Sequence, residues 1–455
     1  MDGEVVNSML IRKYNRPVPR YTSYPTVPFW KDQLDDQTWI SILKKKFAEQ
    51  DQVGLSLYIH LPFCESLCTY CGCNKKITTN HSVEEEYLEA IEKEWLTYRK
   101  IMNQTPFIKE IHLGGGTPTF FSPNNLQRLL VFILKDVKIS PHHEFSIEGH
   151  PNNTTLQHLE MLHSMGFRRI SYGVQDLDPT VQRVINRIQP FENLKSCTEN
   201  ARKVGFSSVN YDLIYGLPLQ TVETMEATIN KVLLLKPDRI AFYSYAHVPW
   251  TSKAQRLFDE SDLPDPEAKL QLYLKGKELL SQNGYADIGM DHFALPSDNL
   301  FAARKEGRLH RNFMGYTSQN AGHLLGLGVS AISDMGEGFA QNKKALHDYY
   351  SAVNAGSLAI QKGYVLTTQD SSFRKYILDI SCKGETQFYE GDIPTLKSQV
   401  FPRLSELELD GLIEWNDQGV KLTSQGHYFI RNVCSAFDLY LNRSEAEMKV
   451  FSKAI

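Results

Sequence analysis

Four of the seven cysteines lie within ten residues, in the segment CESLCTYCGC. Cys64, Cys68 and Cys71 have the spacing C-x3-C-x2-C, short enough for one loop to bring three thiolates to three irons of a cubane cluster. Since such clusters usually take four cysteine ligands, three ligands leave one iron open to a small molecule that chelates through an amine and a carboxylate. Cys73 follows too closely to reach the same cubane, so we expect it to lie near the cluster unbound.

Two other uses of clustered cysteines fit the pattern less well. Zinc prefers paired C-x-x-C arms and would need further ligands, such as His60 or His81. Disulfides are typical of secreted proteins, whereas clustered cysteines in a cytosolic chain more often serve metal or redox chemistry. The spacing therefore favours an iron–sulfur cluster.

The composition of the chain argues against nucleic-acid binding and against a membrane protein. The 455 residues suffice for two or three domains, and 49 Lys and Arg against 53 Asp and Glu give no basic excess for a nucleic-acid partner. No apolar run reaches the roughly 18 residues that a membrane span needs. The N-terminal stretch has the pattern of neither a secretory signal nor a transit peptide. We expect a cytoplasmic monomer.

Strand-like and helix-like segments alternate along the first two thirds of the chain. This alternation predicts repeated right-handed βα units and a parallel sheet, hence an α/β fold. Six or seven units are too few for a complete eight-stranded barrel, so we predict a partial (β/α)6 barrel. The expected strands are 55–61, 107–113, 143–148, 168–174, 208–214 and 239–246, with a further candidate at 286–293.

The rest of the chain differs in pattern from the barrel at 37–294. Residues 1–36 combine prolines with aromatic residues. This composition favours an extended arm that packs over a pocket; the alternative is a disordered leader. Residues 295–340 are rich in glycine and indicate a connector that lines the site. Residues 341–455 are mainly helical in pattern and include a helix–hairpin–helix order like that of a winged helix. Without basic excess, we expect this region to be a cover domain.

Candidate binding residues follow the expected strands, at the edge where parallel barrels place their chemistry. Gly115 and Gly116 belong to a GGG run that lets backbone groups approach a ligand, although such runs also form plain tight turns. Glu148 could accept two ribose hydroxyl hydrogen bonds, or could form a salt bridge at the strand end.

A second set of polar residues follows the next strands. Gln175, Arg187 and Asp212 could bind an amino-acid zwitterion, with Arg187 on the carboxylate and Asp212 on the ammonium group. They could equally form internal ion pairs. A carboxylate within the apolar strand of Asp212 favours function, because burying it unpaired is costly.

Several motifs together carry a family resemblance over essentially the whole chain. They are CESLCTYCGCNK, LGGGTPT, SIEGHPN, SYGVQDLDPTVQRVINR, NYDLIYGLPLQT, GMDHFALP, LHRNFMGYT and RYTSYPT. The chain resembles the oxygen-independent coproporphyrinogen III oxidases (coproporphyrinogen dehydrogenases) of the radical S-adenosylmethionine (SAM) superfamily. The cysteine loop and GGGTP are typical of the superfamily, whereas the arm, the Cys73 extension and HRNFMGYT are typical of this family.

The resemblance implies a 4Fe-4S cluster on Cys64, Cys68 and Cys71 and two SAM molecules, one of them on the open iron. It implies first-SAM contacts at Tyr58, Gly115, Glu148 and Ile332, and second-SAM contacts at Tyr70, Gly116, Thr117, Gln175, Arg187, Asp212 and Ala246. Two positions depart from the family pattern. Tyr70 stands where Phe is frequent, and Gly149-His150 stands where an acidic residue often follows the glutamate.

The implied activity is the oxidative decarboxylation of two propionates of coproporphyrinogen III to vinyl groups, through hydrogen abstraction by a 5'-deoxyadenosyl radical. The product would be protoporphyrinogen IX, for haem biosynthesis, with an electron donor such as flavodoxin or ferredoxin. A tetracarboxylate substrate requires cationic donors near the barrel mouth. The candidates by residue type and position are Arg20, His310, Arg311 and His323.

Two rival functions remain open at this level. One is a haem chaperone of the same superfamily, but such relatives typically lack the arm and carry an Asp-Phe pair where this chain has Gly72-Cys73. The other is a radical SAM enzyme that acts on haem or another porphyrin.

Overall fold

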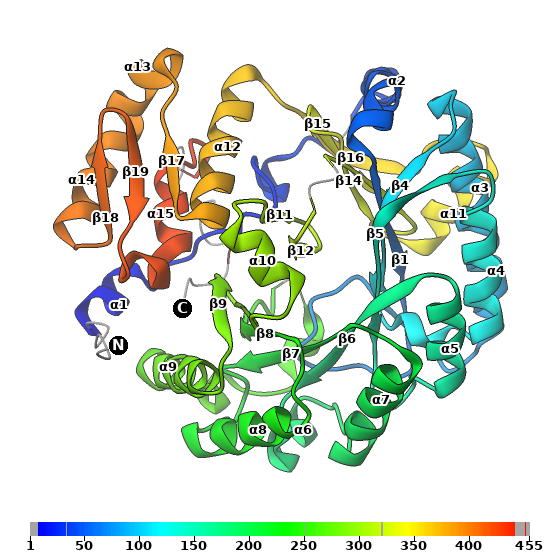
Figure 1. The fold of residues 1–455 in the computed structure, drawn as a ribbon, viewed down its shortest axis with the longest axis horizontal. Helices are drawn as coiled ribbons and strands as arrows, with labels where there is room; N and C mark the ends of the chain where they lie inside the picture. The colour runs from blue at the N-terminus through cyan, green and yellow to red at the C-terminus, as the bar shows by residue number, and fades with distance from the viewer. Residues whose placement is uncertain (1–7, 33, 251, 320–321, 442–450, 452–455) are drawn as a thin grey trace.

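Six parallel strands form the centre of the molecule, each followed by at least one helix (Figure 1). The computed structural model describes residues 8–32, 34–250, 252–319, 322–441 and 451. Neighbouring strands pair in chain order and in parallel. The strands are β1 (Leu55–Leu61), β4 (Phe107–Gly115), β5 (Lys138–Gly149), β6 (Phe167–Gln175), β7 (Ser208–Tyr215) and β8 (Arg239–Ser244).

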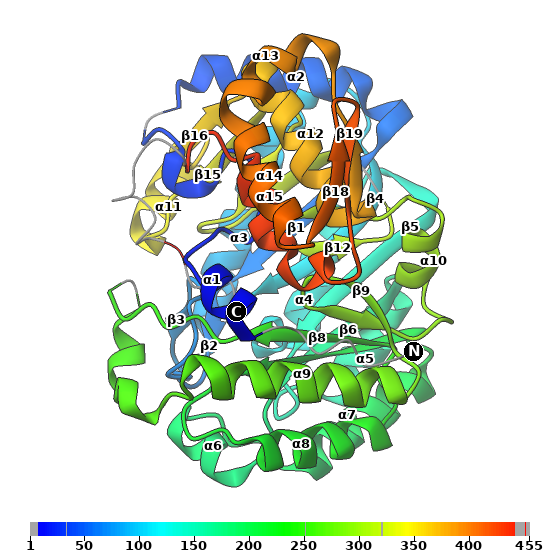
Figure 2. The same ribbon diagram turned by 90° about the vertical axis from the view of Figure 1, so that its left-hand side faces the viewer.

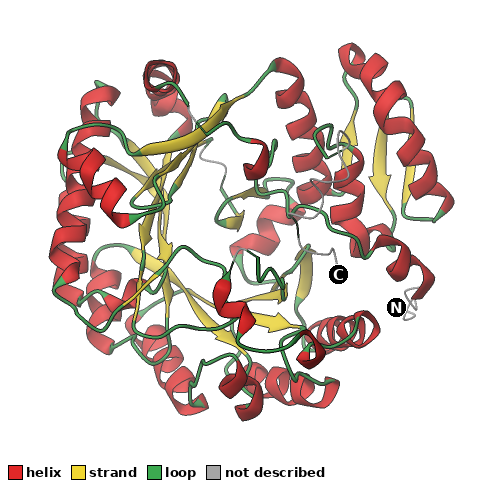
Figure 3. Cartoon of the chain, turned by 180° about the vertical axis from the view of Figure 1, so that it is seen from behind, coloured by secondary structure: helices red, strands yellow, loops and turns green. Residues whose placement is uncertain are grey.

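The helices that follow these strands cover the outer face of the curved sheet (Figure 3). They are α3 (Val83–Met102), α4 (Pro123–Ile133), α5 (Leu156–Ser164), α6 (Pro179–Val184), α7 (Phe191–Val204), α8 (Val222–Leu234) and α9 (Pro266–Gln282). The predicted α/β fold with a partial barrel of six βα units is confirmed.

Side chains of β1 point alternately to the hydrophobic core and to the barrel interior. Leu55, Leu57 and Ile59 are fully buried in the core beneath the helices. The intervening Tyr58 lines a cavity on the other face. Because successive side chains of a strand point to opposite faces, one strand contributes both to the core and to the binding site.

The sheet extends beyond the six units on both sides, to twelve strands. On one side β13 (His323–Leu327) pairs in parallel with β1, and β14 (Ile332–Asp334), β15 (Gly338–Asn342) and β16 (Ile360–Val365) continue antiparallel. On the other side β10 (His292–Ala294) pairs antiparallel with β8, and β9 (Ala286–Gly289) completes the edge.

These additions correct two expectations. The segment 286–293 is not one parallel strand, because β9 and β10 form an antiparallel pair there. The segment 295–340 is more than a connector, since it supplies β13, β14 and most of β15 to the main sheet, which continues to β16 at Val365. These strands are only three to six residues long, too short for alternation to be recognised in a glycine-rich sequence.

The C-terminal region forms its own hydrophobic cluster beside the barrel. Its main elements are α12 (Thr368–Lys383), α14 (Phe401–Leu409), α15 (Ile430–Ala436) and a three-stranded sheet of β17 (Glu385–Gln387), β18 (Ile413–Asn416) and β19 (Gly419–Leu422). The predicted helix–hairpin–helix order is present as α14, β18–β19 and α15.

The N-terminal arm lies against this C-terminal region (Figure 2). It begins with a short helix, α1 (Ser8–Tyr14), and is extended only after it; residues 1–7 lie outside the described part. The Tyr21 hydroxyl donates to Asp438 (3.1 Å), and the Leu439 amide donates to the Tyr24 hydroxyl (3.2 Å). The aromatic residues that set the arm apart from a solvated leader are thus largely buried.

The remaining elements are short or peripheral, apart from α2. They are α2 (Asp36–Val53), β2 (Phe63–Cys64), β3 (Lys76–Ile77), α10 (Asn299–Lys305), β11 (His310–Asn312), β12 (Gly315–Thr317), α11 (Leu346–Asn354) and α13 (Ile393–Thr395), with 3-10 turns at Val27–Phe29, Pro118–Phe120, Lys253–Arg256, Glu260–Asp262, Glu390–Asp392 and Gly426–Phe429 and a π turn at Leu396–Val400. Among the described helices, none has both the length and the apolar character to cross a bilayer.

Candidate active site

The cysteine loop leaves the carboxyl end of β1 and is fixed to its neighbours by backbone hydrogen bonds. A short parallel pair, β2 with β3, closes the base of the loop. The amides of Gly116 and Thr117 donate to the carbonyls of Leu61 (2.8 Å) and Phe63 (2.9 Å). On the other side, the Thr69 amide donates to the Ile185 carbonyl (3.0 Å). The loop is therefore held between β4 and α6.

Polar groups surround the three cysteine sulfurs. Thr117 Oγ1 donates to Cys64 Sγ (3.3 Å), and Arg187 Nη1 donates to Cys68 Sγ (3.5 Å). Burial raises the pKa of Cys64 to about 11, whereas the hydrogen bond from Cys73 and the charge of Lys75 lower the pKa of Cys71. The thiolate, the form that binds iron, is therefore favoured at Cys71 and opposed by burial at Cys64.

The donor set fits a cubane better than a single ion. Within the described ranges, no three His, Cys, Asp or Glu side chains are placed to hold one metal ion together. A cubane makes no such demand, because each of its irons takes one protein thiolate. Cys64, Cys68 and Cys71 line the same cavity and could each take one iron, leaving the fourth open.

Two adjoining cavities lie at the cysteine loop. The larger, of about 470 Å³, contains the three cysteines together with Tyr70, Gly116, Thr117, Gln175, Arg187 and Asp212. The smaller, of about 240 Å³, contains Tyr58 and Ile332. Cys73, Gly115 and Glu148 line both. Of the residues expected for the first SAM, Tyr58 and Ile332 line only the smaller cavity, whereas Gly115 and Glu148 line both. The residues expected for the second SAM line only the larger cavity, except for Ala246, which lines neither.

Glu148, one residue before the end of β5, lines both cavities. One carboxylate oxygen accepts from the Gly115 amide (3.1 Å), and the other accepts from His112 Nε2 (3.3 Å). Although burial opposes ionisation, these hydrogen bonds and the charge of His112 hold the pKa of Glu148 below its usual value. Glu148 is therefore ionised at neutral pH and remains an acceptor.

The pKa of Asp212 on β7 is shifted upward, in contrast to that of Glu148. Burial and the nearby Glu148 raise its pKa to about 7, although Arg187 and Arg169 oppose the shift. Close by, Gln175 Oε1 and Arg187 Nε are buried and have no hydrogen-bond partner in the described part of the chain. Unsatisfied buried polar groups are costly, and here they face a cavity, which marks this wall as a place for a polar ligand.

Two of the four cationic candidates lie together inside the barrel. Arg20 of the arm donates from Nη2 to the Ser244 carbonyl (2.7 Å) and lies over the ring of Tyr243, which lines the larger cavity. Arg311 donates to the Arg20 carbonyl (3.4 Å) and is only 4% exposed. Its Nε and Nη1 have no hydrogen-bond partner among the residues that the structure describes.

The structure does not bring the two histidine candidates to this place. His310 precedes Arg311 on β11 and therefore points to the other face, where it lines a separate cavity. His323 begins β13 and pairs with Leu55 at the start of β1, at the edge opposite the cysteine loop. Strand alternation and strand direction therefore place both candidates away from the cysteine loop.

Two histidines shape the surroundings of the smaller cavity: His60, which the sequence suggested only as a zinc ligand, and His112, which it did not single out. His60 donates from Nε2 to the Asn74 carbonyl (2.8 Å) and accepts from the Tyr58 hydroxyl at Nδ1 (3.1 Å). Burial lowers the pKa of His60, so the ring is neutral. His112 holds Glu148, as described above. Both lie on the inward-facing positions of β1 and β4, and this two-residue period was the signal that could have found them.

The comparisons with known proteins agree with this geometry. Residues 58–232 match the family model of the radical SAM superfamily. The chain is 39% identical over 452 residues to the oxygen-independent coproporphyrinogen III oxidase of Escherichia coli (strain K12), with 98% of each chain covered. It belongs to the oxygen-independent coproporphyrinogen III oxidase family.

Other relatives support the assignment to this family. The Pseudomonas aeruginosa protein of the same name is 37% identical over 440 residues, with 95% of each chain covered. The solved structure of coproporphyrinogen III oxidase (HemN) from Escherichia coli, described as a radical SAM enzyme, superposes with a TM-score of 0.89 at 37% identity, covering 96% of this chain and 99% of that one. Family membership implies a 4Fe-4S cluster and SAM as cofactors of an oxidoreductase.

The first prediction concerns the cluster ligands. Cys68→Ala removes one thiolate from the proposed site, so anaerobically reconstituted protein should lose most of its visible iron–sulfur absorbance and its turnover. Cys197→Ala, a buried cysteine in α7, is the matched control and should retain about four irons per chain. Unchanged iron content and absorbance in Cys68→Ala would refute the ligand assignment.

Proposed function

We propose that this chain converts two propionate side chains of coproporphyrinogen III to vinyl groups in a SAM-dependent oxidative decarboxylation, giving protoporphyrinogen IX. The observation that carries the proposal is the agreement over nearly the whole chain with relatives named for this activity. The cysteine loop and the two cavities beside it supply the site that such a reaction requires.

The protein's part in this chemistry is binding and orientation. Cys64, Cys68 and Cys71 would hold the cluster. When bound, the cluster and SAM supply the electron and the 5'-deoxyadenosyl radical that removes a propionate β-hydrogen. Arg187, beside Cys68 Sγ, would offset the negative charge of the thiolates. The arm covers the region next to Tyr243 and would limit access of water.

Two SAM sites are proposed on the two cavities. Tyr58, Gly115, Glu148 and Ile332 line the smaller space, where Glu148 can accept ribose hydroxyls. Tyr70, Gly116, Thr117, Gln175, Arg187 and Asp212 line the larger one, where Arg187 and Asp212 can bind the two ends of an amino-acid zwitterion. The backbone of Ala246 accepts from Gln255, which also binds the Tyr70 carbonyl, so its role would be indirect.

Arg20 and Arg311 are proposed to bind substrate propionates. Each comes from a segment outside the six βα units, and they meet beside Tyr243 at the larger cavity. A carboxylate would satisfy the unpartnered donors of Arg311, and charge-assisted hydrogen bonds of this kind are among the stronger ones.

The remaining partners follow from the proposed reaction. An external one-electron donor such as flavodoxin or ferredoxin would reduce the cluster. A cluster held by thiolates suits a reducing compartment such as the cytoplasm, and we propose a monomer there. The haem chaperone and the enzyme acting on another porphyrin are not favoured by the relatives, which are named for coproporphyrinogen oxidation.

The decisive assay is anaerobic. Reconstituted protein with SAM, dithionite, coproporphyrinogen III and an electron acceptor should form vinyl products together with 5'-deoxyadenosine. Formation of 5'-deoxyadenosine without vinyl product would support the radical chemistry but indicate another substrate. Haem would then be the first alternative substrate to test. Neither product from protein with an intact cluster would indicate a binding protein.

The second SAM site predicts a dependence on pH. Since the raised pKa of about 7 leaves Asp212 largely protonated at pH 6 and ionised at pH 8, affinity for a second SAM should rise about tenfold over this interval. Equilibrium dialysis at pH 8 should show two SAM molecules bound per wild-type chain and one per Asp212→Asn chain. In Asp212→Asn the number of bound SAM molecules should not change between pH 6 and pH 8. Asp348→Asn on α11 is the control and should behave as the wild type does. Two SAM sites without pH dependence in Asp212→Asn would contradict the proposed role of Asp212 in SAM binding.

Arg311 predicts a specific loss of substrate binding. Arg311→Gln removes a charge-assisted contact, so KM for coproporphyrinogen III should rise at least about tenfold, while SAM binding is retained. Because Arg311 is buried and could affect folding, Arg20→Gln is the second variant, with Arg128→Gln on the outer face of α4 as the control. Unchanged KM in both Arg20→Gln and Arg311→Gln would end the proposal.

A further inference from the structure

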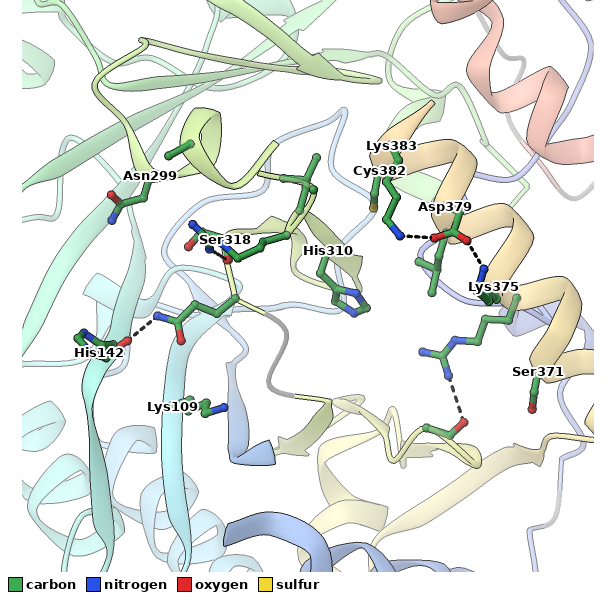
Figure 4. A pocket seen from close by; sticks show the side chains of 18 residues that line it. Lys109, His142, Asn299, His310, Ser318, Ser371, Lys375, Asp379, Cys382 and Lys383 are labelled. Atoms are coloured by element: carbon green, nitrogen blue, oxygen red, sulfur yellow. Dashed lines mark hydrogen bonds and ion pairs between the residues drawn. The ribbon is translucent and has the colours of Figure 1, made fainter. Parts of the chain in front are cut away.

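A cavity of about 910 Å³ lies apart from the cysteine loop (Figure 4). One wall carries Lys109 near the start of β4 and His142 in the early part of β5, and the other is α12 of the C-terminal region. The cysteine loop meets β4 at its other end, at Gly116. None of the residues that line this cavity lines the two cavities of the candidate active site.

Positive charge dominates the lining of this cavity. It contains the cationic side chains Lys109, Arg308, Arg374, Lys375 and Lys383, but Asp379 is the one acidic residue that lines it. Arg374 pairs with Asp334, and Arg308 pairs with Glu306 outside the lining. Lys375 and Lys383 share Asp379, at 2.5 and 2.8 Å.

Lys109 has no ion-pair partner among the described residues. Together with the two lysines that share one carboxylate, it leaves the cavity with two uncompensated positive charges. Lys375 and Lys383 are half-exposed, whereas Asp379 is largely buried. An ammonium group has three donors, so either lysine can bind an anion while it stays paired with Asp379. An incoming anion can therefore bind Lys375 or Lys383 without a large loss elsewhere.

The charges lie on opposite sides of the cavity. Figure 4 shows Lys109 and His142 on the sheet side, Lys375, Asp379 and Lys383 on α12, and His310 between them. The His310 side chain has no hydrogen-bond partner among the described residues. Burial beside Arg374 lowers its pKa to about 4, so the neutral ring can donate one hydrogen bond. A single small ion would reach one wall, whereas a longer molecule with separated anionic groups would reach both.

We propose that this cavity binds a small organic polyanion with two or more carboxylate or phosphate groups, at a site separate from the active site. Lys109 binds one anionic group, and Lys375 with Lys383 binds another. His310 donates to the molecule between them. The hairpin β11–β12 is the partition between this cavity and the barrel interior, since His310 faces the cavity and the next residue, Arg311, contacts Arg20.

The test uses the full chain with its cluster reconstituted and two probes, citrate for carboxylates and pyrophosphate for phosphates. Isothermal titration at constant ionic strength should show saturable binding of at least one probe, with one site per chain. In the double variant Lys109→Gln/Lys383→Gln the affinity should fall at least about tenfold, which is about 1.4 kcal/mol. The probe that binds more tightly identifies the anionic group.

Matched controls separate this site from general charge effects. Lys195→Gln/Lys231→Gln removes two exposed lysines from α7 and α8 on the outer side of the barrel, and it should bind as the wild type does. Lys109→Gln alone serves if the double variant does not fold, as judged by circular dichroism. Absence of binding of both probes up to about 10 mM, or equal affinity in the lysine variants, would overturn the proposal.

Discussion

Two backbone hydrogen bonds join the cysteine loop to the glycine loop, from Gly116 to Leu61 and from Thr117 to Phe63. They require the two chains to approach closely, and a Cβ on Gly116 would lie 2.6 Å from the Pro62 backbone. Gly115 has φ +120° and would place a Cβ 2.8 Å from the His60 ring. Glycine at both positions is therefore a condition for bringing the cysteines next to the ends of β4 and β5.

The site contains two carboxylates, Glu148 and Asp212, whose pKa values are shifted in opposite directions. Glu148 accepts hydrogen bonds from Gly115 and His112, which keep it ionised, whereas Asp212 has no such donor and its pKa rises to about 7. The ionised Glu148 contributes to the shift of Asp212. A cation between them would stabilise both charges, as expected of a space that receives a ligand with a sulfonium or ammonium group.

Local sequence patterns predicted the parts of the structure that local rules determine. The six parallel strands β1 and β4 to β8, with the cysteine and glycine loops, follow from alternation, spacing and the common edge of parallel strands. The positions of His310 and His323 depend instead on β11 and β13, strands of only three and five residues, and β13 pairs with β1 far away in the chain. A three-residue strand gives no period, and a one-residue shift reverses the face of every side chain, so their orientation could not be derived from the sequence.

The arm shows how segments outside the barrel can complete its interior. Arg431 of α15 donates to the Val18 and Pro19 carbonyls, which fixes the arm just before Arg20. Arg20 then reaches the Ser244 carbonyl at the end of β8, and Arg311 of β11 donates to the Arg20 backbone. Three segments far apart in sequence thus place two guanidinium groups beside the larger cavity. This accumulation of positive charge supports the proposed binding of substrate carboxylates in the barrel interior.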